Sequence, residues 1–329
     1  ALLIFPLAVF LAVMFGSRTL IRRLSERAIL DHPNDRSSHT APTPRGAGIA
    51  VVGALLPAWA LIGAVTGQLT EPLFLVAGMA LVLAVVSWID DLRGLSPLVR
   101  IGVQAAAIAA VMTLAPPTAP VFGGLLPPAL DHLAAGLIWL WFVNLYNFMD
   151  GIDGLAGVET LAIGVGAFVV ARKLGLGGAQ MALALTLAAA ALGFLRWNWH
   201  PAKIFLGDVG SIPLGFLTGW LLLNLAAAGA WAPALILPLY FLADATWTLA
   251  RRGLQGRRIW EAHREHFYQR AVDSGLRHDQ VTWIIAVANM FLVMLSLVAM
   301  RGQPIAALLG AAAAITLLLV LLAKGGPTD

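Results

Sequence analysis

Four short polar segments stand out in an otherwise apolar chain. They are WIDD with Asp90 and Asp91, NLYNFMDGIDGLAG at 144–157, FLGDVGS with Asp208, and HREHFYQR at 263–270. Carboxylate and amide oxygens suit a hard cation such as Mg²⁺, which usually binds through one or two carboxylates and substrate phosphates. Basic side chains and glycine turns nearby suit phosphate oxygens. Together the segments indicate phosphoryl transfer between a soluble nucleotide-activated donor and a lipid acceptor.

The second segment carries a polar residue at every third position. These residues are Asn144, Asn147, Asp150 and Asp153. This spacing places them along one side of a helix and the turn that follows it. Asn144 and Asn147 lie at a membrane edge, where an unpaired polar group is costly, so a functional role is favoured over a surface role.

The other polar residues leave alternatives open. Adjacent residues of a helix diverge by about 100°, so only one of Asp90 and Asp91 is expected to point into a shared site, and both could be solvated charges. His263 and His266 could be surface residues, and HREH differs from the zinc-binding HExxH.

Asp244 lies in an apolar window and is a functional candidate by default. A structural ion pair with Arg251 or Arg252 is the alternative.

Composition indicates what positions these residues. Of 329 residues 60% are hydrophobic, 12% are charged and none is cysteine. A soluble protein is about half apolar and about a quarter charged, so disordered chains, disulfide scaffolds and ordinary cytosolic enzymes are excluded. We predict an all-α polytopic membrane protein, a single domain over 1–329, with about eleven transmembrane helices. The apolar windows are roughly 1–20, 46–66, 72–89, 98–115, 133–148, 155–171, 179–195, 211–228, 231–250, 280–300 and 303–323.

The distribution of basic residues predicts the orientation. All Lys and Arg except Arg172, Lys173 and Arg301 fall in loops on one side. Because cytoplasmic loops are rich in Lys and Arg, we expect a periplasmic N-terminus, a cytoplasmic C-terminus and a first window that is retained and is no signal peptide. The cytoplasmic loops are then near 21–45, 90–97, 149–154, 196–210 and 251–279. The net charge of +4 needs no nucleic acid as a partner, because basic loops beside anionic membrane lipid are sufficient to explain it.

With the segment DHPNDRSSHTAPTPRGAGIA at 31–50, the motifs follow the order seen in a known family. The chain resembles the polyprenyl-phosphate N-acetylhexosamine-1-phosphate transferases (glycosyltransferase family 4) over residues 31–270. Eleven spans with the N-terminus outside are similar to the branch that initiates O-antigen synthesis, whereas the phospho-N-acetylmuramoyl-pentapeptide translocase branch has ten.

The resemblance implies a reaction and its participants. A UDP-N-acetyl sugar and undecaprenyl phosphate would give undecaprenyl-diphosphate-sugar and UMP, with Mg²⁺ or alternatively Mn²⁺. The setting would be the cytoplasmic face of a bacterial inner membrane, at the start of O-antigen or lipopolysaccharide synthesis. A homodimer is left open.

The resemblance also implies residue roles. The catalytic set would be Asp90, Asp91, Asp208, His263 and His266, with Asp208 and Asp150 as metal ligands. The substrate-binding set would be Asn147, Asp150, Gly151, Asp153, Phe205, Arg36, His39, Arg45 and Arg264. Within that set, Asp153 and Gly151 would contact the uracil and Phe205 would stack on it.

One departure and two rivals bear on this reading. The pentapeptide enzymes carry consecutive histidines where this chain has His-Arg-Glu-His, which disfavours that role and leaves the sugar open among N-acetylglucosamine, N-acetylfucosamine and N-acetylquinovosamine. A transporter or flippase would need paired broken helices and repeat symmetry, which the sequence lacks. A CDP-alcohol phosphatidyltransferase would need Ala-Arg after the first of its Asp-Gly pairs. In this chain other residues follow the first pair, and Leu155-Ala156-Gly157 follows the second.

Overall fold

A computed structural model of the chain describes residues 3–31, 33, 41–68, 70–258 and 263–324. Within these residues the chain forms thirteen helices and one two-stranded sheet. The helices are α1 (Ile4–Glu26), α2 (Gly48–Thr66), α3 (Thr70–Arg93), α4 (Pro97–Leu114), α5 (Pro128–Phe148), α6 (Leu155–Lys173), α7 (Gly178–Asn198), α8 (Asp208–Ala227), α9 (Trp231–Ile236), α10 (Leu239–Leu254), α11 (Phe267–Asp273), α12 (His278–Ala299) and α13 (Pro304–Lys324), and the strands are β1 (Leu30–Asp31) and β2 (Thr43–Pro44).

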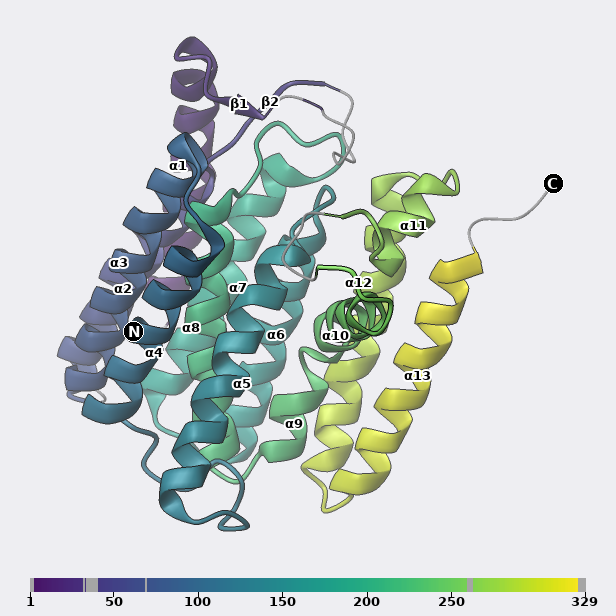
Figure 1. Cartoon of the computed structure of the whole chain (residues 1–329). Coiled ribbons are helices and arrows are strands. Elements are labelled where there is room, and N and C mark those ends of the chain that lie inside the picture. The colour runs from purple at the N-terminus through teal and green to yellow at the C-terminus, as the bar shows by residue number, and fades with distance from the viewer. Residues whose placement is uncertain (1–2, 32, 34–40, 69, 259–262, 325–329) are drawn as a thin grey trace.

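Ten of the described helices are long and apolar enough to cross a bilayer, which confirms the prediction of an all-α polytopic membrane protein. Helices suit this setting because they satisfy their backbone hydrogen bonds internally. The helices pack side by side in Figure 1. Helix α8 has 94% of its apolar window buried, against 17% for α1, so α8 is the centre of the bundle and its first residue, Asp208, lies among several neighbouring helices.

The predicted window at 231–250 is interrupted, and it accounts for the difference between eleven windows and ten long helices. Helix α9 ends at Ile236 and α10 begins at Leu239, after Pro238, which has no backbone N–H to continue the helix. Figure 1 shows α10 almost end-on, whereas the long helices run from top to bottom of the view, so the axis of α10 departs from the direction of the bundle.

A strap formed by residues 44–48 fixes the N-terminal loop to the loop before α8. Strand β1 pairs antiparallel with β2, with Leu30 opposite Pro44. The N–H groups of Gly46 and Ala47 then donate to the carbonyl of Phe205 at 3.0 and 2.9 Å. Arg45 is therefore held beside the beginning of α8, at the end of the bundle where Figure 1 also places α11.

Helices α2 and α8 approach each other through glycines. A Cβ atom on Gly48 would lie 2.2 Å from the backbone nitrogen of Gly210, which is too close for any side chain. The two helices can therefore meet at their N-terminal ends only because both positions lack a side chain. This contact brings the strap to the first turn of α8.

Candidate active site

Asp91 and Asp208 meet where the end of α3 reaches the beginning of α8. The Asp91 carboxylate accepts hydrogen bonds from the N–H groups of Asp208 (3.2 Å) and Val209 (3.0 Å). It therefore occupies the place of an N-cap, where a negative charge is stabilised by the free N–H groups of the helix. Gly207, which precedes α8, has φ of +76°, and a Cβ there would lie 2.9 Å from Asp91 Oδ2. Glycine is thus required by the backbone and by the carboxylate.

Two arginines join the carboxylates of this site. Arg45 lies 2.8 Å from Asp91 Oδ1 and 2.7 Å from Asp208 Oδ1. Arg100, from the first turn of α4, lies 3.0 Å from Asp90 Oδ2 and 3.5 Å from Asp208 Oδ2. Burial alone would lower the pKa of Arg45, but the charges of Asp208 and Asp91 raise it above its ordinary value. Asp90, Asp91 and Asp208 are thereby brought together, so the expectation that only one of Asp90 and Asp91 points into the shared site is wrong.

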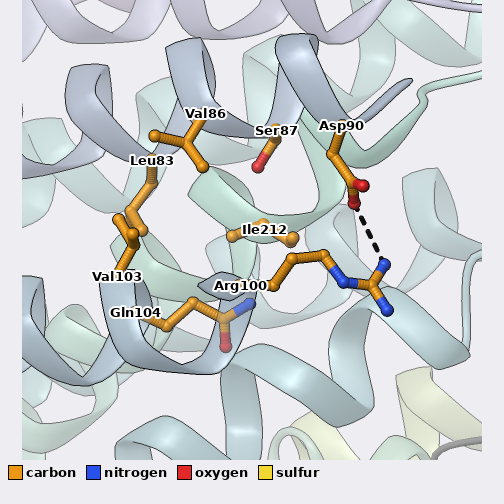
Figure 2. Close-up of a pocket in the computed structure, with 8 residues that line it drawn as sticks. All are labelled: Leu83, Val86, Ser87, Asp90, Arg100, Val103, Gln104 and Ile212. Atoms are coloured by element: carbon orange, nitrogen blue, oxygen red, sulfur yellow. Dashed lines mark hydrogen bonds and ion pairs between the residues drawn. The ribbon is translucent and has the colours of Figure 1, made fainter. Parts of the chain in front are cut away.

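The Asp90–Arg100 pair borders a small cavity of about 10 Å³ between α3, α4 and α8 (Figure 2). Its wall includes Ser87 and Gln104 beside apolar side chains. Gln104 Oε1 accepts a hydrogen bond from Asn144 Nδ2 at 2.7 Å. Asn144 therefore satisfies a buried partner on α4, which is a structural role for the first residue of the polar stripe.

Asn147 and Asp150 extend the site toward the turn after α5. Asn147 Oδ1 accepts a hydrogen bond from Ser211 Oγ at 2.5 Å, which ties α5 to α8. Burial raises the pKa of Asp150 to about 7; the charge of Arg45 opposes this shift, and those of Asp208, Asp91 and Asp153 add to it. Among the described residues, no hydrogen bond or ion pair to the Asp150 carboxylate is found. It is therefore available to a cation.

Asp153 belongs to a neighbouring cluster with two histidines. Its Oδ2 lies 2.7 Å from His200 Nδ1 and accepts from Ala202 N–H at 3.1 Å, and its Oδ1 lies 3.4 Å from His278 Nδ1. Burial on its own would raise the pKa of Asp153. The hydrogen bonds with His278 and His200 outweigh this effect, so the pKa of Asp153 is lowered. Asn198 Oδ1 accepts from Gly154 N–H at 2.8 Å and closes the turn.

Four of these residues, Arg100, Asn198, His200 and His278, were not predicted as site residues. Each is a polar residue at the end of a helix, or just beyond one, on the side predicted to be cytoplasmic. That position was the only local signal for them.

The histidines of the HREH segment form a third cluster. His266 is buried, with Nδ1 3.2 Å from Asp244 Oδ1, and the rings of His263 and His266 lie 4.8 Å apart. Burial, His266 and the charge of Arg252 lower the pKa of His263 to about 4. In the described part of the chain no hydrogen bond or ion pair joins either histidine to Asp90, Asp91 or Asp208.

The remaining predicted residues have varied placements. Arg264 forms an ion pair with Asp273, and the proposed pairing of Asp244 with Arg252 is wrong, because Arg252 pairs with Glu265. Phe205 lies in the loop before α8 and its backbone pairs with Arg45.

Gly151 lies against Tyr268, whose hydroxyl is 2.1 Å from the position that a Cβ would take. Arg36 and His39 lie outside the described residues.

Comparison with known proteins agrees with these motifs. A sequence model of glycosyl transferase family 4 matches residues 73–226. The chain is 30% identical over 308 residues to the decaprenyl-phosphate N-acetylglucosaminephosphotransferase of Mycobacterium tuberculosis, covering 80% of this chain and 74% of the relative. It is 27% identical over 303 residues to the probable undecaprenyl-phosphate N-acetylglucosaminyl 1-phosphate transferase of Bacillus subtilis, covering 87% and 81%. It is also 29% identical over 311 residues to a phospho-N-acetylmuramoyl-pentapeptide-transferase of a Picosynechococcus species, covering 85% and 80%.

Proposed function

The chain belongs to glycosyl transferase family 4, and from that membership we propose that it is a polyprenyl-phosphate sugar-1-phosphate transferase. The reaction moves an N-acetylhexosamine 1-phosphate from a UDP-sugar to undecaprenyl phosphate and releases UMP. It takes place on the cytoplasmic face of a bacterial inner membrane and begins O-antigen or a related glycan.

The observation that supports this proposal most is the convergence on Asp208. The Asp91 carboxylate accepts a hydrogen bond from the backbone N–H of Asp208. Arg45 and Arg100 pair with the two carboxylate oxygens of Asp208 at 2.7 and 3.5 Å. These residues come from four separate parts of the chain and meet at one end of a membrane bundle. A cluster of carboxylates and guanidinium groups there suits a diphosphate that arrives from water and an acceptor that is anchored in lipid.

The charges of the cluster fit a divalent cation. Three carboxylates, those of Asp90, Asp91 and Asp208, pair with two guanidinium groups, and Asp150 adds a fourth carboxyl group whose pKa is raised to about 7, so a bound cation would compensate the excess of carboxylates. All the donor atoms are oxygens, which Mg²⁺ prefers. Asp208 and Asp150 would hold the ion, and when bound it would neutralise charge that develops on the diphosphate.

We propose direct in-line attack by the lipid phosphate on the phosphorus that bears the sugar. The second pKa of a phosphate monoester is about 6, so the acceptor is largely a dianion at neutral pH and needs little help from a base. Arg45 and Arg100 would hold phosphate oxygens in place, and positioning would dominate catalysis. A phospho-aspartyl adduct on Asp90 or Asp91, trapped with the donor alone, would contradict this one-step route.

The donor nucleotide would bind beside this cluster. Asp153 and Gly151 would contact the uracil, and Phe205 would stack on it. Asn147 would border the same region, and His263, His266 and Arg264 would lie toward the diphosphate. Asp153 is held by His200 and has a lowered pKa, so it is an acceptor at neutral pH and suits a base that presents an N–H donor.

One assay tests this function against its rivals. Purified protein is given undecaprenyl phosphate, Mg²⁺ and a panel of UDP-N-acetyl sugars that includes UDP-N-acetylmuramoyl-pentapeptide, and UMP is measured. We expect release that requires both the lipid and the metal, with a simple N-acetylhexosamine preferred. If UDP-N-acetylmuramoyl-pentapeptide is the one donor of the panel that gives UMP, the result would support the peptidoglycan alternative. The absence of UMP with every donor would favour a transporter.

A further inference from the structure

Asp244 is a buried carboxylate on α10 that receives an unusual number of hydrogen bonds. Its side chain is 0% exposed. Five donors surround it: Tyr240 Oη at 3.1 Å, Thr248 Oγ1 at 3.3 Å, His266 Nδ1 at 3.2 Å, and the backbone N–H groups of Phe267 at 3.1 Å and Tyr268 at 3.3 Å. A carboxylate has about four lone-pair sites, so Asp244 is saturated.

Three of these donors belong to the segment 266–268. A buried carboxylate is tolerated only when its partners are in place, so this segment is bound to α10 at a fixed position. The bonds reach the side chain of His266 and the first two N–H groups of α11. Asp244 therefore fixes the ring of His266 and the backbone that follows it at the same time.

Tyr268 carries this constraint to the turn after α5. The side chain is fully buried, its ring stacks on His266 with centroids 5.6 Å apart, and its hydroxyl donates to the carbonyl of Phe148 at 3.0 Å. Because the hydroxyl also fills the space at Gly151, the turn 148–151 rests directly on Tyr268. This turn carries Asp150, so a continuous set of contacts runs from Asp244 to Asp150.

We propose that Asp244 is a positioning residue that holds the HREH segment and the turn carrying Asp150 in a fixed position relative to each other. It acts through His266 and Tyr268 and does not touch the substrates. The proposal rests on the proposed function only in that the positioned groups, His266 and Asp150, are assigned to the transferase site. The contacts themselves join α5, α10 and α11 whatever the reaction is.

Hydrogen exchange of the substrate-free protein tests the coupling without any assay of activity. In Asp244→Asn one acceptor oxygen becomes an NH₂ donor that faces other donors, so we expect exchange to rise about 10-fold or more in peptides covering both 263–270 and 148–154. Tyr268→Phe, which removes only the hydroxyl, should raise exchange at 148–154 and leave 263–268 unchanged. Thr246→Val is the matched control, because Thr246 lies on the exposed face of α10 and bonds to Trp141. Unchanged exchange at 148–154 in both test variants would overturn the proposal.

Kinetics test whether the coupling serves catalysis. Asp244→Asn and Tyr268→Phe should each lower kcat by about 10-fold with KM for the polyprenyl acceptor within about 2-fold. If Asp244 acts through Tyr268, the double variant will lose less than the product of the two single losses. Strictly multiplicative losses would contradict a shared route. A wild-type protein without turnover would refute the proposed function, whereas the exchange result would still decide the coupling.

Discussion

Asp208 concentrates the electrostatics of the site in a single side chain, because both arginines pair with it and Asp91 bonds to its backbone. Asp208→Asn keeps the shape and removes the charge. We expect UMP release to fall by about 10²-fold or more, as when a preorganised charge is removed from other active sites. Asp279→Asn is the control, since Asp279 forms an ion pair with the exposed Arg277, and it should stay within about 2-fold. A loss below 10-fold in Asp208→Asn would show that the cluster is not the reaction centre.

His263 makes the stability of the folded protein depend on pH. Burial, His266 and Arg252 lower its pKa from 6.5 to about 4. Between these values the unfolded chain takes up a proton that the folded chain does not, so stability falls as the pH drops through this range. His263→Gln removes the titration and keeps an acceptor for the N–H of Glu265. The drop in Tm between pH 7 and pH 5, measured by scanning fluorimetry, should be smaller in the variant, and an equal drop would refute the assignment.

At the scale of the elements, the approach of α2 to α8 sets the distance between Arg45 and Asp208. Gly48→Ala would place a Cβ 2.2 Å from Gly210 N and force the helices apart. We expect a loss of about 1–3 kcal/mol in stability together with a fall in UMP release, because the strap moves with α2. Gly53→Ala, on the same helix with open space around it, should be neutral or gain up to about 1 kcal/mol. Thermal melts and the UMP assay separate the two, and equal behaviour would exclude the close contact.

The break between α9 and α10 shows where local sequence stops being informative. The window 231–250 reads as a continuous span, and its prolines do not decide the matter because Pro57 and Pro213 lie inside unbroken helices. The break lies at Pro238, between the end of α9 at Ile236 and the beginning of α10 at Leu239. Nothing in the window itself distinguishes Pro238 from the prolines that lie inside continuous helices.

The residues of the site likewise fall into those that the local sequence predicts and those that depend on packing. Asp90, Asp91, Asp150 and Asp208 could be predicted because carboxylates are conspicuous at the ends of apolar spans. Arg100 was missed because a single arginine beyond a span usually means only a cytoplasmic loop. Its pairing with Asp90 and Asp208 depends on how α3, α4 and α8 pack, which spacing along the chain does not reveal.

For the whole molecule, the uneven distribution of Lys and Arg predicts which end of the bundle faces the cytoplasm. The chain has no cysteine, so an introduced one is the sole thiol. In intact cells a membrane-impermeant maleimide should label Thr118→Cys, in the loop before α5, and should label Gln255→Cys, after α10, only once the membrane is opened. Both positions are exposed. The reverse pattern would invert the topology and place the carboxylate cluster outside the cell.

The strap across residues 44–48 has a consequence for synthesis. Arg45 and its partner Asp208 are separated by 163 positions, so the ribosome synthesises Arg45 well before Asp208. At about 5–20 residues per second that delay is on the order of 10 to 30 seconds, during which six further helices enter the bilayer. A nascent chain that stalls before α8 keeps a guanidinium group without its principal counter-ion and cannot turn over. Catalytic competence therefore arrives late, and only in chains whose insertion has passed the central helix.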